Sequence, residues 1–229
     1  MKWDNSAGIL RFTAVVLLAV LLIPSGLCLG ASDLLSQLSV VGGSHMEKAV
    51  LALARQSLMS SVRGTRPPDT DDVLSSLNLP EQTVQLLTRR SAGVFVTVVA
   101  KNKVRACVGS IWPNTGSIAS EISHFGGLAA ARDLRRPPIE PSELAGVDLA
   151  VSIVGRLERV QKGHVWDPAR YGVFVRSGGR SGVILPGEAL THAKQVSWAL
   201  AEAGISSSSG YETYRFQTVK LGASISVRH

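Results

Sequence analysis

The sequence is poor in cysteine and in aromatic residues, and both shortages limit what the chain can be. Cys28 and Cys107 are the two cysteines among 229 residues, and Phe, Trp and Tyr together make up 5%. Cys28 belongs to the N-terminal segment discussed below, so the mature chain keeps one thiol and no internal disulfide is expected. Because 45% of the residues are hydrophobic, the chain can still bury a sizeable and mainly aliphatic core. That content argues against a disordered protein.

Established enzyme fingerprints are missing too. The chain has no GxGxxG motif in a βαβ setting, no Walker loop, no GxSxG and no HExxH. His124, His164 and His192 are far apart, and none has a second His or Cys at ligand spacing. The sequence therefore predicts no metal site and no cofactor, and it leaves the reaction class open.

The N-terminus has the pattern of an export signal. Lys2 and Arg11 precede or begin an almost unbroken apolar run over residues 12–23, and Pro24 and small residues follow it. This pattern predicts a signal peptide over residues 1–30 and an exported protein, whether secreted, periplasmic or lumenal. The alternative is an uncleaved membrane anchor over residues 12–29, although a spanning helix needs about 20 apolar residues. Residues 31–46 are then expected to be a polar lead-in, and residues 47–229 to be a single domain.

The net charge is modestly basic and widely spread. The formal charge of +7 falls by one when Lys2, Arg11 and Asp4 are removed with the signal. Only residues 132–136 form a dense basic run, so a nucleic-acid partner is not favoured, and export makes it less so. We expect a small-molecule or protein ligand instead, and membrane contact only through an uncleaved N-terminal segment. The oligomeric state is left open.

Hairpins separated by helices dominate the rest of the chain. Strands are predicted over 93–100, 104–111, 147–154, 172–176, 182–185 and 211–221. Helices are predicted over 47–59, 80–87, 118–132 with Ser117 as its cap, and 192–203 between Thr191 and Gly204. The pair Gly126-Gly127 indicates a kink or a close approach by another element. This order favours an α+β fold, an antiparallel hairpin-built sheet flanked by helices, over a doubly wound parallel sheet.

The hairpin that contains Cys107 is the best candidate for a site. Strand alternation places Arg105, Cys107 and Gly109 on one face, so a guanidinium near the sulfur would favour the thiolate. Gly109 would let a substrate or another backbone approach closely. Cys107 and Arg105 are therefore the candidate catalytic residues. The alternative is that Cys107 is a small buried core residue, which is an ordinary use of cysteine.

Three more residues are candidates for contact with a ligand. Asp133 lies at the end of the predicted helix and would orient an arginine, and Arg135 would hold an anionic group bidentately. The alternative is a helix terminus whose basic residues meet the helix dipole and solvent. Pro186 follows the predicted strand 182–185 and begins a rigid turn.

Together, these segments resemble the AMMECR domain family. Residues 93–98 match its opening strand, and Val104-Arg105-Ala106-Cys107-Val108-Gly109 matches a signature that usually reads Leu-Arg-Gly-Cys-Ile-Gly. Residues 129–139 match a segment that normally reads Ala-Ala-x-x-Asp-x-Arg-Phe-x-Pro-Leu, and residues 151–153 and 182–186 match two further blocks. The resemblance runs from about residue 47 to residue 219.

The resemblance implies an α+β fold and a suspected active site around the Arg-x-Cys-x-Gly strand, although the family's biochemical function is not settled. Ala106, Arg136 and Glu202 depart from its usual glycine, aromatic residue and lysine. Members are usually intracellular, so this chain is expected to be a divergent exported relative whose activity is retained, altered or lost. Two functions stay open: an enzyme using the Cys107 thiolate, or a non-catalytic extracytoplasmic module that binds a small anionic ligand or a protein partner.

Overall fold

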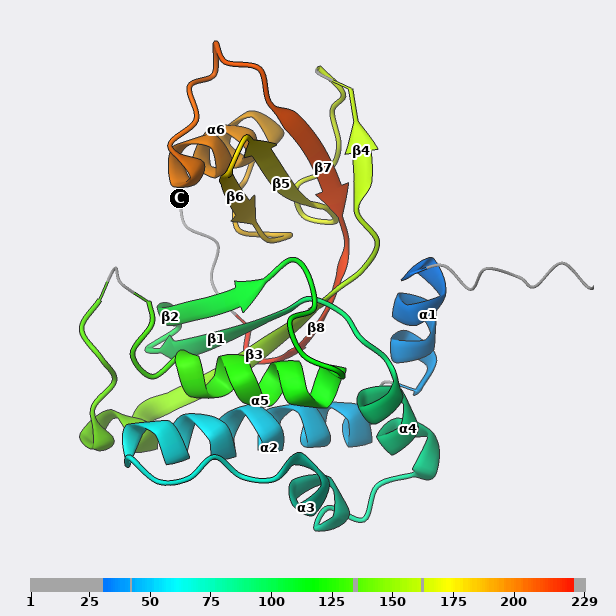
Figure 1. Ribbon diagram of the computed structural model, residues 1–229, viewed down its shortest axis with the longest axis vertical. Helices are drawn as coiled ribbons and strands as arrows, with labels where there is room; N and C mark the ends of the chain where they lie inside the picture. Colours follow the sequence, from blue (N-terminus) through cyan, green and yellow to red (C-terminus); the bar gives the residue numbers. More distant parts are fainter. Residues whose placement is uncertain (1–30, 42, 134–135, 162, 225–229) are drawn as a thin grey trace, which may run out of the picture.

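The computed structural model describes residues 31–41, 43–133, 136–161 and 163–224 (Figure 1). The predicted signal peptide with Cys28, and the candidate ligand residue Arg135, lie outside these ranges. Within them, every helix is too short or too polar to cross a membrane.

Four helices come first in the chain, and the strands follow in groups separated by helices (Figure 1). The helices are α1 (Ala31–Val41), α2 (Gly43–Val62), α3 (Thr70–Ser75), α4 (Glu81–Arg89), α5 (Ile118–Leu128), the 3-10 helix η1 (Pro141–Gly146) and α6 (His192–Ala203). The strands are β1 (Val94–Ala100), β2 (Lys103–Ser110), β3 (Val147–Val154), β4 (Glu158–Val160), β5 (Gly172–Ser177), β6 (Arg180–Ile184), β7 (Glu212–Phe216) and β8 (Thr218–Gly222).

The predicted α+β class with antiparallel pairing is confirmed, but the described strands form two sheets where one was expected. The first sheet has the order β2-β1-β3-β8 and the second has the order β4-β7-β5-β6. The reason lies in the last predicted strand, 211–221, which is interrupted at Gln217. Its halves β7 and β8 join different sheets, and the Gly155 N–H donates to the Gln217 carbonyl at 2.9 Å where the chain crosses between them.

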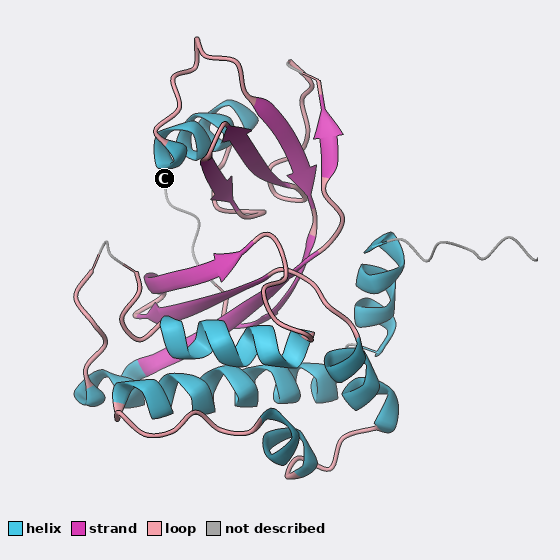
Figure 2. Cartoon of the chain, in the orientation of Figure 1, coloured by secondary structure: helices cyan, strands magenta, loops and turns pink. Residues whose placement is uncertain are grey.

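One face of the first sheet is covered by α2 and α5 (Figure 2). Val94, Val96 and Val98 point into this core and are fully buried, as alternation along a strand requires. Gly126 lets the two helices meet, because a Cβ atom there would lie 2.9 Å from the Ala54 carbonyl oxygen. The close approach predicted from Gly126-Gly127 is therefore confirmed.

The opposite face of the first sheet faces the second sheet, and we call it the inter-sheet face. Its residues follow from the strand register: one row is Cys107, Thr97, Ala150 and Gly222, and the next is Gly109, Phe95, Ser152 and Lys220. A small apolar cluster contributed by both sheets closes part of the space between them; its buried members are Ile111, Val154, Phe174, Leu185 and Phe216. The far face of the second sheet packs on α6.

The segment expected to be a polar lead-in is helical. Leu34 and Leu38 of α1 are 5% and 0% exposed and belong to the main core. The neighbouring Leu35 packs directly against Gly155, since a Cβ atom on that glycine would lie only 2.4 Å from the Cδ1 atom of Leu35. The apolar spacing within residues 34–41 is that of an amphipathic helix, which the polar content of the segment hid.

Candidate functional site

Cys107 lies on β2, an edge strand of the first sheet, and its side chain is half-buried and outside the three hydrophobic clusters. The Thr97 hydroxyl, directly opposite on β1, donates a hydrogen bond to the Cys107 Sγ at 3.2 Å. The backbone N–H of Cys107 donates to Asp133 Oδ2 at 2.9 Å. Thr97 and Asp133 thus hold the cysteine from two sides.

Asp133 comes into this position because α5 ends earlier than predicted. The helix stops at Leu128, four residues before the expected end at Arg132. The chain then turns back toward β2, and the Ile139 N–H donates to the Ala130 carbonyl at 2.7 Å. Asp133 therefore binds the backbone of the candidate nucleophile, and it satisfies an edge-strand N–H that would otherwise need another partner.

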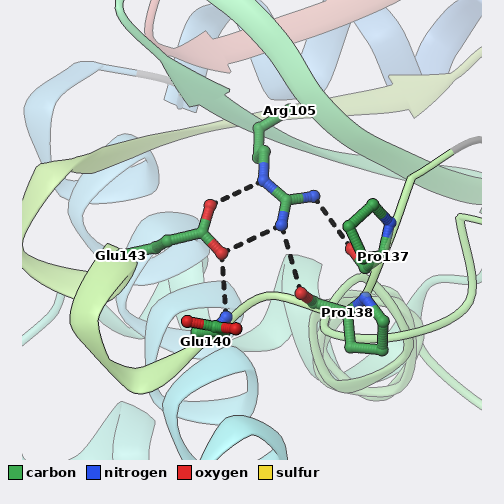
Figure 3. Close-up of polar contacts among 5 residues, drawn as sticks. All are labelled: Arg105, Pro137, Pro138, Glu140 and Glu143. Atoms are coloured by element: carbon green, nitrogen blue, oxygen red, sulfur yellow. Dashed lines mark hydrogen bonds and ion pairs between the residues drawn. The ribbon is translucent and has the colours of Figure 1, made fainter.

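The guanidinium of Arg105, which was predicted to lie near the sulfur, is bound by Glu143 and by the backbone of residues 137 and 138 (Figure 3). Its Nε and Nη2 donate to the Glu143 carboxylate at 2.7 and 2.9 Å, and Nη1 and Nη2 donate to the carbonyls of Pro137 and Pro138 at 3.1 and 3.2 Å. Hydrogen bonding to Glu143 raises the pKa of Arg105, and the same bonds lower the pKa of Glu143. Arg105 therefore fastens the segment 137–143 to β2.

A β-bulge explains why simple alternation failed at Arg105. The β1–β2 register pairs Val98 with Ala106 and then Val99 with Val104, so Arg105 has no residue opposite it. A bulge re-aims the side chain of the extra residue relative to a regular strand. The side chain is only 12% exposed, consistent with a role in holding the fold rather than with binding a ligand from solvent.

Gly109 and Pro186 also have structural explanations. A Cβ atom on Gly109 would lie 2.4 Å from both Cδ1 of Phe95 and the Val94 carbonyl oxygen, so it is the neighbouring strand β1, another backbone, that approaches closely at this glycine. Pro186 lies half-buried in the turn after β6. That turn is closed by a hydrogen bond from the Leu185 N–H to Glu188 Oε2 at 3.0 Å, and Gly187 adopts a φ of 76° in it.

Lys220 on β8 is the residue that sequence reasoning missed. It lies on the inter-sheet face one row from Cys107, and its side chain is exposed. Surrounding protein nevertheless desolvates the amine and lowers its pKa, while the charges of Glu188 and Cys107 act in the opposite direction. The amine of Lys220 thus lies within electrostatic reach of both a thiol and a carboxylate. A lysine between Val219 and Leu221 on an otherwise apolar strand was the available signal.

Two histidines that are distant in sequence lie beside Trp166, whose side chain packs between the second sheet and α6. The ring centroid of His192 is 4.1 Å from that of Trp166, and the ring centroid of His164 is 6.3 Å away. Desolvation, with a smaller effect of His164, lowers the pKa of His192. Within the described ranges, no three His, Cys, Asp or Glu side chains are placed to hold a metal ion.

Two surface hollows lie away from Cys107. One of about 480 Å³ is lined by Arg176, Ser177, Gly178, Gly210, Tyr211 and Glu212 at the tip of the second sheet. The other, of about 380 Å³, lies between α2 and the first sheet and includes Glu47, Arg55 and Asp148. Neither is lined by Cys107 or Thr97, although Gly222 of the inter-sheet face lines the second.

The fold and this site define an α+β protein with two antiparallel sheets and an Arg-x-Cys-x-Gly strand at the edge of one of them. Residues 51–221 match the family model described as AMMECR1. The chain therefore belongs to the AMMECR1 family.

Several relatives are known only as uncharacterised proteins. A protein of Thermotoga maritima is 37% identical over 109 residues, which are 47% of this chain and 63% of that protein. Protein CA_C1420 of Clostridium acetobutylicum is 29% identical over 170 residues, or 73% of this chain and 34% of that protein. The chain thus spans less than two thirds of the length of these two relatives.

The crystal structure of the uncharacterised protein PH0010 from Pyrococcus horikoshii has the same fold. It superposes with a TM-score of 0.57 at 20% identity, and the match covers 76% of this chain and 90% of that one. At this identity the similarity concerns the fold alone.

Proposed function

We propose that this AMMECR1-family chain is an enzyme whose nucleophile is the Cys107 thiolate. The observation that carries the proposal is the hydrogen bond from the Thr97 hydroxyl to Cys107 Sγ at 3.2 Å. A hydrogen bond donated to the charged form of a group favours that form, and the thiolate is the reactive form of cysteine. Cys107 is half-buried and lies outside the hydrophobic clusters, which supports access by a substrate.

The site offers a different cation from the one predicted. Arg105 is occupied by Glu143, but the Lys220 ammonium lies within electrostatic range of the thiol. The strand spacing of a sheet puts the backbones of β2 and β8 about 14 Å apart, so this charge acts at long range. Thr97 is therefore the main activating group, and Lys220 assists.

The pH dependence of Cys107 alkylation in the folded chain tests this proposal, with the unfolded chain as reference. We expect rapid labelling and an apparent thiol pKa clearly below the ordinary value of about 8.5. The Cys107→Ser variant should lose the labelling and keep the fold. Labelling only after unfolding would contradict the proposal and would favour the non-catalytic binding module, tested by ligand screening against the folded domain.

The same protein is proposed to act outside the cytoplasm, after removal of residues 1–30. The basic start, the apolar run of residues 12–23 and the small residues after Pro24 support export. Because α1 packs into the core, a cut after residue 30 would leave the folded part intact. Mass spectrometry of the protein isolated from its native host should find a mature N-terminus near residue 31. An intact N-terminus in the membrane fraction would support the anchor over residues 12–29 instead.

A further inference from the structure

The hollow at the tip of the second sheet is built from two segments that are far apart in the sequence. Residues 176–178 end β5 and begin the turn after it, whereas residues 210–212 lead into β7. The Ser177 hydroxyl donates to the Gly210 carbonyl at 2.7 Å and so joins the two sides. The volume of about 480 Å³ lies within the usual range of small-molecule sites, about 300–1,000 Å³. The hollow is therefore large enough for a small ligand.

Arg176 lines this hollow with a guanidinium that is held in place. Its Nε donates to Glu212 Oε2, and the guanidinium carbon lies 5.4 Å from the centroid of the Tyr214 ring. Glu212 Oε2 also accepts a hydrogen bond from the Tyr214 hydroxyl at 3.3 Å. The Arg176 side chain is nevertheless 47% exposed, and its two Nη atoms carry further N–H donors. A ligand can therefore meet an oriented guanidinium, which lowers the entropy cost of binding.

A second arginine changes the charge balance of the hollow. Arg159 of β4 donates from Nη2 to Glu212 Oε1 at 3.0 Å, and its side chain is 68% exposed. The single carboxylate of Glu212 is thus shared by two guanidinium groups, which leaves one positive charge over. This surplus attracts an anion from solvent.

Tyr211 gives the same hollow an apolar side. Its ring is half-buried and packs against the cluster between the second sheet and α6, so its position is fixed. A guanidinium binds phosphate or carboxylate oxygens through paired N–H groups. An oriented guanidinium and a fixed ring around one small volume suit an oxyanion that is attached to a small apolar body.

We propose that this hollow binds a small organic anion whose phosphate or carboxylate group pairs with Arg176 and whose apolar part lies against Tyr211. Arg159 acts indirectly, because it offsets the charge of Glu212 that would otherwise repel the anion. Cys107 does not line the hollow, so this inference stands or falls independently of the proposed thiol chemistry.

A titration of the folded, isotope-labelled protein at constant ionic strength tests the inference by NMR. Phenyl phosphate and benzoate are the probes, and the backbone amide signals of Gly178 and Gly210 report on the hollow. We expect these signals to shift and to saturate with at least one of the two anions, and the tighter of them identifies the preferred oxyanion. Phenol has the ring but lacks the charge, so it should not saturate the signals in the same concentration range.

Substitutions of arginine separate specific binding from a general effect of charge. Arg176→Gln should weaken binding about tenfold or more, because it removes hydrogen bonds to a charged group. Arg159→Gln should weaken it by a smaller factor, whereas Arg66→Gln, the same change at an exposed loop position, should have no effect. Arg176→Lys, which keeps the charge but loses the fork, should also weaken binding and serves as a second variant. A titration without saturation, equal binding of phenol, or unchanged binding in a folded Arg176 variant would overturn the inference.

Discussion

The Thr97→Val substitution tests the activation of Cys107 most directly. Valine has nearly the shape of threonine, so the change removes the hydroxyl that donates to Sγ and leaves the packing of β1 against β2 in place. A hydrogen bond to a charged group contributes about 1.5–3 kcal/mol. Sulfur accepts more weakly than oxygen, so the lower end of that range applies to the thiolate.

One pKa unit corresponds to about 1.4 kcal/mol, so the Cys107 thiol pKa should rise by about one unit or slightly more. The thiolate fraction at pH 7 would then fall about tenfold. A thiolate of higher pKa is intrinsically more nucleophilic, with a Brønsted coefficient of about 0.4–0.5, and this recovers part of the loss. We therefore expect iodoacetamide to react about three- to fivefold more slowly at pH 7, and at an equal or higher rate well above the pKa.

The assay is the alkylation rate from pH 5 to 10, followed by mass spectrometry on the folded protein. Thr97→Ser keeps the hydroxyl and should restore most of the rate. Thr83→Val removes a buried hydroxyl from α4 and serves as the matched control, with no expected change in the thiol pKa. An unchanged pH profile in folded Thr97→Val would refute the reasoning.

Three further predictions concern the stability of the fold. Arg105→Lys should lower the free energy of unfolding by about 1–3 kcal/mol in urea titrations, because an ammonium cannot reproduce the fork to Glu143; an unchanged midpoint would contradict this. Leu38→Ala should cost about 2–5 kcal/mol if α1 is part of the core, whereas Val40→Ala, 87% exposed, should have little effect. The pKa of His192 is lowered on folding, so the unfolded chain binds more protons and stability should fall as pH drops through about 6.5; His192→Gln should flatten this dependence in unfolding curves followed by Trp fluorescence.

Local signals in the sequence predicted local structure well. Ser117 and Thr191 cap α5 and α6 as expected, since each side chain accepts a hydrogen bond from a backbone N–H three residues on. Gly204 ends α6 with a left-handed φ of 61°. The β1–β2 turn contains Lys101 and Asn102, both with positive φ, as a two-residue hairpin turn requires. Such features depend on a few neighbouring residues and can be predicted from them.

Features that depend on distant partners could not be predicted in this way. The residues near Gln217 do not indicate that β7 and β8 join different sheets. The division depends on distant partners, since β8 pairs with β3 whereas β7 pairs with β4 and β5. Lys220 could not be chosen as a site residue from the sequence, because only the register of four strands places it on the same face as Cys107. The family signature indicates the cysteine but not its neighbours across the sheet.

The bulge at Arg105 changes what the Arg-x-Cys-x-Gly strand means in this protein. Regular alternation would make the three residues one chemical unit, but here Arg105 holds the segment 137–143 and Gly109 accommodates Phe95. Cys107 remains the candidate for chemistry, with Thr97 of β1 bonded to its sulfur and Asp133 bonded to its backbone N–H. Substitutions should therefore divide into two groups. Changes at Arg105 act on stability, and on thiol reactivity only in proportion to unfolding, whereas changes at Thr97 or Lys220 act on reactivity with the fold retained. An Arg105 variant that stayed folded yet shifted the pKa of the Cys107 thiol would show that the arginine acts on the thiol, and it would refute this division.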